Sequence, residues 1–185
     1  MKQLRPRTKI NARAGFSLLE AMLGMTVLVV AIVGTMGSLS TSLELTQSNR
    51  ETIIATQALR RQVERMSGTA LANVYRTFND TTADDLTPSA PGAHFDIPEL
   101  TVQVGDADGS VGHITFPTAN ATQATLFENY SNADWGFPRD LSGDGTVSTT
   151  DVAGSYILLP VRVRAEWRGS SGDRVIEVET IMGIR

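Results

Sequence analysis

The sequence feature that most constrains this chain is a long apolar stretch close to its start, residues 16–39. Up to Val33, its only polar residues are Ser17, Glu20 and Thr26. As a helix, these 24 residues would be about 36 Å long, enough to cross a hydrocarbon core of roughly 30 Å. The stretch therefore predicts a membrane-spanning helix.

One acidic side chain, Glu20, lies inside this apolar stretch. An ionised carboxylate at mid-helix costs about 2.5–3.5 kcal/mol on insertion scales, so such a residue normally has a partner. A simple signal anchor would leave Glu20 without a purpose. A cleaved secretory signal also fits poorly, because the apolar run exceeds the usual length of about 7–15 residues and no A-x-A-like site follows it.

Charge is distributed unevenly along the chain. Five of the 16 basic residues precede Gly15, whereas all 20 acids follow it, so the remainder has a formal charge of −9. This acidic remainder argues against nucleic-acid binding, which needs the opposite sign. The basic leader places the N-terminus in the cytoplasm by the positive-inside rule, and we expect residues after 40 to lie outside the inner membrane. The chain has no cysteine, which excludes disulfides.

The residues at the start of the apolar stretch resemble a known processing signal. Gly15-Phe16-Ser17-Leu18-Leu19-Glu20, with a short basic leader before it and an apolar run after it, resembles the class III signal of type IV pilins and type II secretion pseudopilins. The resemblance implies that prepilin peptidase removes the leader, residues 1–15, and that Phe16 is N-methylated. It also implies that Glu20 pairs with the new N-terminal amine of a neighbouring subunit. This pairing would compensate the desolvation cost of burying both charges.

The remaining chain predicts an α+β fold of the pilin type. Residues 41–78 show apolar side chains at three- and four-residue spacing, which indicates an amphipathic helix continuous with the hydrophobic helix 16–40. Ser67-Gly68 is a possible kink or early end of this helix. We expect the helix to pack on an antiparallel β-sheet formed by a globular domain, residues 79–185.

Two hairpins are predicted within that domain. Residues 100–104 and 111–116 alternate apolar and polar side chains on either side of a Gly- and Asp-rich turn. Residues 156–167 and 174–184 predict a second hairpin at the end of the chain. A terminal hairpin with a Trp before a Gly-rich turn resembles minor pilins and minor pseudopilins in this feature, more than it resembles major subunits.

Residues 140–151 have the spacing of a twelve-residue calcium loop. The ligand positions would be taken by Asp140, Ser142, Asp144, Thr146, Ser148 and Asp151. Gly145 is at the position of the sharp turn, and Val147 is expected to point into the core. The loop resembles dockerin-type calcium repeats, although Ser142 departs from their usual Asn or Asp. We expect a weak Ca²⁺ site, with a Kd on the order of 10⁻⁴–10⁻³ M; the alternative is an acidic, Gly-rich surface loop.

The other polar residues indicate no catalytic set, and we expect no enzyme activity. His94 and His113 are the only histidines, and packed or surface positions are the expectation for both. Asp106 and Asp108 could coordinate a cation, but turns favour Asp and Gly in any case, so a turn is expected there.

Three functions are left open by the sequence. The first is a minor type IV pilin, whose partners would be other pilin subunits, prepilin peptidase and, before assembly, the inner membrane. The second is a minor pseudopilin of a type II secretion system, which would end in a periplasmic pseudopilus. The third is a calcium-dependent adhesin or ligand-binding module held by a simple signal anchor. The first two predict cleavage after Gly15, whereas the third predicts an intact N-terminus.

Overall fold

The computed structural model describes residues 17–118 and 125–184. Gly15 and Phe16, the predicted processing residues, lie outside the described residues. The chain divides into two compact units, Met1–Leu43 and Glu44–Arg185. A single 50-residue helix, α1 (Leu18–Ser67), contributes to both units, so each half of it is described with its own unit.

In the first unit, α1 is apolar and exposed. Every side chain from Ser17 to Leu43 is exposed, and the most apolar window has a mean hydropathy of 2.1. The helix is long and apolar enough to cross a membrane and could serve as an anchor. The hydroxyls of Thr26 and Thr35 donate to backbone carbonyls one turn earlier, at 2.9 and 3.0 Å. These two polar groups are thus satisfied within the helix, as an apolar environment requires.

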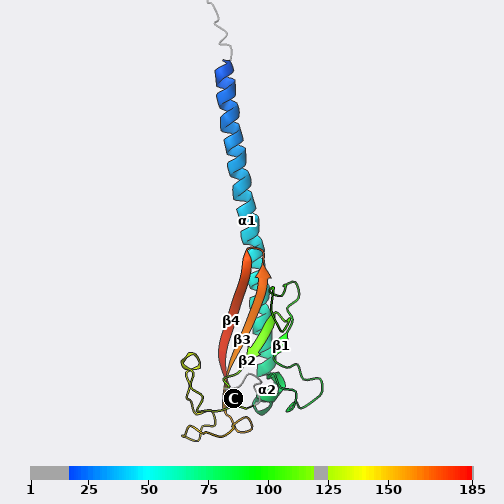
Figure 1. Cartoon of the computed structure of the whole chain (residues 1–185), viewed down its shortest axis with the longest axis vertical. Helices are drawn as coiled ribbons and strands as arrows, with labels where there is room; N and C mark the ends of the chain where they lie inside the picture. Colours follow the sequence, from blue (N-terminus) through cyan, green and yellow to red (C-terminus); the bar gives the residue numbers. More distant parts are fainter. Residues whose placement is uncertain (1–16, 119–124, 185) are drawn as a thin grey trace, which may run out of the picture. The chain divides into compact units, whose positions relative to one another are not determined.

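The second unit contains a four-stranded antiparallel sheet with the strand order β1-β2-β3-β4 (Figure 1). Its strands are β1 (His94–Phe95), β2 (Gly112–Thr115), β3 (Leu158–Gly169) and β4 (Gly172–Gly183). A one-turn helix, η1 (Ala133–Trp135), lies in the long segment before β3. The predicted fold class is confirmed: a long N-terminal apolar helix accompanies an antiparallel sheet, an α+β arrangement consistent with a pilin-like fold.

One face of the sheet and the C-terminal part of α1 form the core of this unit. Side chains alternate across a strand, so every second residue of β3 from Leu159 to Trp167 is buried. Leu59 and Met66 of α1 belong to the same buried cluster. The indole Nε1 of Trp167 donates to Glu51 Oε2 at 3.3 Å, a polar contact between helix and sheet inside the core.

The amphipathic helix is shorter than predicted. Residues 41–78 do not form one helix, because α1 ends at Ser67 and a separate helix, α2 (Leu71–Phe78), follows. The break falls at the predicted weak point, where Gly68 has low helix propensity and the N–H of Thr69 donates to Met66 O at 3.0 Å in a tighter turn. The break allows α2 to bury its own face, formed by Val74, Tyr75 and Phe78.

The first predicted hairpin is wrong in one strand, and the terminal hairpin is confirmed. Residues 100–104 are not a strand; β2 pairs instead with β1 on one side and β3 on the other. Residue Thr101 still receives one backbone bond, from Arg168 N at 2.8 Å. Strands β3 and β4 pair along their whole length up to Gly169 and Gly172, which makes their turn tighter than the sequence indicated.

Candidate functional site

Glu20 lies in the first turn of α1 and is exposed. A carboxylate near a helix N-terminus is favoured by the positive end of the helix dipole. The large side chains around it are also exposed, with Leu18 at 81% and Leu23 at 63%. The position offers an acid on an otherwise apolar surface, and its pairing with a neighbouring subunit stays a prediction.

The first half of loop 140–151 forms a compact turn around Asp140. The Oδ1 atom accepts from Gly143 N at 2.6 Å and Ser142 Oγ at 3.2 Å, and Oδ2 accepts from Gly145 N at 2.8 Å. Led by the Gly145 N–H, these donors lower the pKa of Asp140 below its ordinary value. Gly145 has a φ of +86°, so the sharp turn predicted there is present and requires glycine.

The next ligand positions continue the same turn. The Oδ1 atom of Asp144 accepts from Thr146 twice, from the backbone N–H at 2.8 Å and the hydroxyl at 2.7 Å. Ser148 lies further along, where its hydroxyl bonds with Thr150 Oγ1 at 2.7 Å. Val147 is 45% exposed, so the prediction that it points into the core is wrong. Its side chain lies on the surface, shortly after the turn at Gly145.

The last predicted ligand, Asp151, is occupied elsewhere. Its Oδ1 atom accepts from Leu126 N at 2.9 Å and Ala153 N at 3.0 Å, next to a bridge with Phe127. In the described part of the chain, the loop's three aspartates do not form a group whose ligand oxygens all lie within 4.8 Å of one another. The structure thus gathers the first half of the predicted ligand set without Asp151.

The residue that holds this loop is Glu128, which the sequence pattern does not single out. It is fully buried, and its Oε1 atom accepts from Leu141 N at 2.8 Å and Ser142 N at 2.7 Å, while Oε2 accepts from Ser148 N at 2.6 Å. Burial alone would raise its pKa, but the backbone donors outweigh burial and hold the pKa of Glu128 below its ordinary value. The loop is therefore wrapped around an internal carboxylate.

A second group of ligand-type side chains lies where β1 meets β2. His94 and His113 are cross-strand neighbours whose ring centroids are 4.5 Å apart. The Oδ2 atom of Asp108 lies 3.4 Å from His94 Nδ1 and 3.7 Å from His113 Nδ1. Within residues 17–118 and 125–184, this trio is the group of His, Cys, Asp or Glu side chains whose ligand atoms all lie within 4.8 Å. The spacing in the sequence does not reveal the trio, because strand pairing brings together two histidines that are 19 positions apart.

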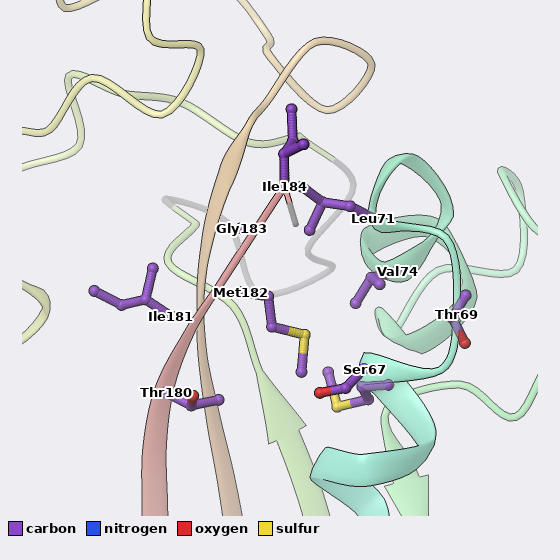
Figure 2. Close-up of a pocket in the computed structure, with 10 residues that line it drawn as sticks. Ser67, Thr69, Leu71, Val74, Thr180, Ile181, Met182, Gly183 and Ile184 are labelled. Carbon is purple, nitrogen blue, oxygen red and sulfur yellow. The ribbon is translucent and has the colours of Figure 1, made fainter.

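A pocket of about 440 Å³ lies between the end of α1, α2 and the end of β4 (Figure 2). In Figure 2, Met182 points toward the helices, whereas its neighbour Ile181 points away from them. Leu71, Val74 and Ile184 add apolar surface, and among the described residues none that lines the pocket is ionisable. The pocket offers shape and apolar contact but no group for acid–base chemistry.

No family model, no curated protein and no solved structure matches this chain. The case for a function therefore rests on the apolar half of α1, on loop 140–151 and on the histidine group at β1–β2.

Proposed function

We propose that this chain is a minor type IV pilin, a structural subunit that prepilin peptidase processes and that is assembled into a pilus or its priming tip. The observation that carries the proposal is the two-part character of α1. One continuous helix is apolar and exposed in the first unit and buries its own face in the α+β core of the second. A filament subunit would need the exposed apolar half for packing in the helical core of the filament, and the other half for holding its own globular domain.

The exposed half of α1 needs a partner on energetic grounds. Between Leu18 and Leu39, thirteen large apolar side chains are 45–81% exposed. Burying such a side chain fully contributes about 1.5–3 kcal/mol, so on the order of 20–40 kcal/mol favours removing this surface from water. A membrane before assembly and neighbouring apolar helices afterwards would each supply that environment. The proposal places the chain in the inner membrane first, with its second unit on the periplasmic side.

Processing is the most direct test. When the chain is produced together with a prepilin peptidase, mass spectrometry should find a mature protein that begins with methylated Phe16. Gly15→Leu should abolish cleavage, whereas Gly24→Leu should not, because Gly24 lies nine positions beyond the cleavage site and a Cβ added there meets nothing within 4 Å. An intact N-terminus in the unmodified chain would reject the proposal and favour a simple anchor.

Assembly tests the role of Glu20. Glu20→Ala should lower incorporation into filaments at least tenfold while the amount inserted in the membrane stays unchanged, because the lost partner is another subunit. Glu44→Ala is the matched control, since Glu44 is an exposed acid further along the same helix. Normal incorporation of Glu20→Ala would contradict the assembly role.

A minor pseudopilin of a type II secretion system is the second candidate, because its subunits would use the same helix. The terminal hairpin, with Trp167 shortly before the Gly169–Gly172 turn, is similar to minor subunits of both systems. Deleting the gene separates them. Loss of surface pili supports the pilin, whereas retained pili with a block in protein export support the pseudopilin.

We also propose that loop 140–151 binds Ca²⁺ weakly. In support, Asp140 is hydrogen-bonded to Ser142 and Asp144 to Thr146 in consecutive parts of one turn, and Gly145 has the required left-handed conformation. Asp151 would have to release Leu126 N to complete the set, which costs part of the binding free energy. The calcium would stiffen the segment ahead of β3.

A further inference from the structure

We infer that His94, His113 and Asp108 form a binding site for a divalent transition-metal ion, with Zn²⁺ as the best fit. The ligand atoms are Nδ1 of His94, Nδ1 of His113 and Oδ2 of Asp108. All three residues belong to the second unit, so the site is independent of the apolar helix and of the proposed role in a filament.

The distances from Asp108 to the two histidines are close to those between ligands of a tetrahedral ion. Two ligands that each lie about 2.0–2.1 Å from zinc in a tetrahedron are roughly 3.3–3.4 Å apart. Asp108 Oδ2 lies 3.4 Å from His94 Nδ1 and 3.7 Å from His113 Nδ1. All three atoms lie within 4.8 Å of one another, so small rotations of the side chains would bring them around one ion.

The hydrogen bonding of His94 leaves one ring nitrogen available to a metal ion. Its Nε2 lies 3.1 Å from Asp80 Oδ1, and a carboxylate can only accept, so Nε2 carries the proton. In the neutral imidazole, Nδ1 then holds a lone pair, and this nitrogen is buried with no hydrogen-bond partner. This nitrogen lies 3.4 Å from Asp108 Oδ2, so one cation, a proton or a metal ion, can bridge the two atoms. A metal ion at this place would coordinate both.

Neighbouring groups hold the ligands in place. Asp80 orients the His94 ring in the carboxylate–histidine–metal arrangement that typically sets ligand geometry and basicity. The Oδ1 atom of Asp108 accepts from Ser110 N at 2.7 Å, which directs Oδ2 toward the two imidazoles. His113 is fixed by its position in β2, opposite His94 in the ladder and opposite Arg164 of β3.

The types of ligand atom determine which metal ions the site favours. Two imidazole nitrogens and one carboxylate oxygen suit Zn²⁺ and its neighbours in the first transition row, whereas Ca²⁺ and Mg²⁺ prefer oxygen ligands only. The His113 and Asp108 side chains are 36% and 35% exposed, so an ion has a path of entry and water can complete the tetrahedron. The bound ion would link the segment after α2, strand β1, the 96–111 loop and strand β2, in a chain without cysteine.

Titration of the metal-free, full-length chain in detergent with Zn²⁺ tests the inference. Calorimetry should give one Zn²⁺ per chain, and the unfolding temperature should rise with Zn²⁺ concentration. Co²⁺ in place of Zn²⁺ should give the visible spectrum of a tetrahedral nitrogen–oxygen site. A tenfold excess of Ca²⁺ should not displace Zn²⁺.

Matched variants decide whether these residues are the ligands. His113→Gln and Asp108→Asn should each lower Zn²⁺ affinity at least tenfold and abolish the Co²⁺ spectrum, whereas Asp96→Asn, which removes an exposed charge two residues from His94, should change neither. Should a variant fail to fold, the Co²⁺ spectrum of the other still decides. The inference is overturned if the unmodified chain does not bind Zn²⁺, or if both variants bind it as tightly as the unmodified chain does.

Discussion

Loop 140–151 and the His94–Asp108–His113 group both place acids beside glycine-rich turns, but they differ in what those acids already bind. In the loop, the carboxylates of Glu128, Asp140 and Asp151 accept backbone N–H groups. In the histidine group, the His94 Nδ1 atom is buried without a partner and faces Asp108. The loop can therefore keep its shape without an ion, whereas the histidine group has a buried nitrogen that the inferred metal ion would bind. A ring nitrogen without a hydrogen-bond partner, rather than the spacing of ligand-type residues, distinguishes the two.

The largest effect is expected from removing the Glu128 carboxylate, which holds the loop. Glu128→Gln replaces one accepting oxygen by an NH₂ group, so at least one buried backbone N–H loses its acceptor and faces another donor. Bonds to charged groups contribute about 1.5–3 kcal/mol each, and we expect the free energy of unfolding to fall by about 3 kcal/mol. Urea unfolding of the full-length chain in detergent measures it. A loss below 1 kcal/mol would show that Glu128 does not hold the loop.

Glu99→Gln is the matched control for this loss. Glu99 forms an exposed ion pair with Arg50, and such pairs contribute at most about 1 kcal/mol. The pH dependence adds an independent check. Because the folded pKa of Glu128 lies below its ordinary value of 4.5, its contribution is complete above that pH and is lost as pH falls through the folded pKa. The difference between the unmodified chain and Glu128→Gln should therefore shrink on acidification below about pH 4.5.

A substitution of Asp80, which contacts His94 but is not a ligand, tests the histidine group. Asp80→Ala removes the carboxylate that fixes the proton on His94 Nε2, while leaving all three ligands. Removing such a supporting partner typically lowers metal affinity 10- to 100-fold, and we expect a Zn²⁺ affinity loss in that range by calorimetry. Asp85→Ala, an acid in the same segment, should leave the affinity within twofold of the unmodified chain. Unchanged affinity in Asp80→Ala would mean that Asp80 does not orient His94.

The sequence predicts most of the fold because its signals are local. The apolar run, the spacing in α1 and the alternation in β3 each act over neighbouring residues, and each leads to an element in the structure. From the sequence, the break after Ser67 is only a possibility, because it depends on the burial of α2.

The sites were harder to predict because they depend on contacts between distant residues. His94 and His113 are brought together by the pairing of β1 with β2. The sequence pattern instead predicts residues 100–104 as the strand that pairs with residues 111–116. Glu128 acts across 13–20 residues of irregular chain on Leu141, Ser142 and Ser148. By contrast, the turn at Gly145 follows from local spacing, and it is present. Local patterns therefore located a turn, whereas tertiary contacts determine which of its groups are free to bind.

The smallest expected effect is that of calcium on the loop. With a Kd near 1 mM, 10 mM Ca²⁺ would stabilise the full-length chain by about 1.4 kcal/mol relative to chelator, which corresponds to roughly 3–6 °C in unfolding temperature. Asp140→Asn should abolish the shift, because the turn is built around that carboxylate.

Asp151→Asn then decides whether the loop must reopen to bind. An asparagine oxygen can still accept from Leu126 N and Ala153 N, so the variant keeps the observed structure but removes a charged ligand. If calcium draws Asp151 away from Leu126, the variant should lose most of the calcium shift; if binding uses only the first half of the loop, the shift should persist. No shift in the unmodified chain would reject calcium binding by this loop, and its carboxylates would then serve only as acceptors for the protein's own donors, unlike the histidine group.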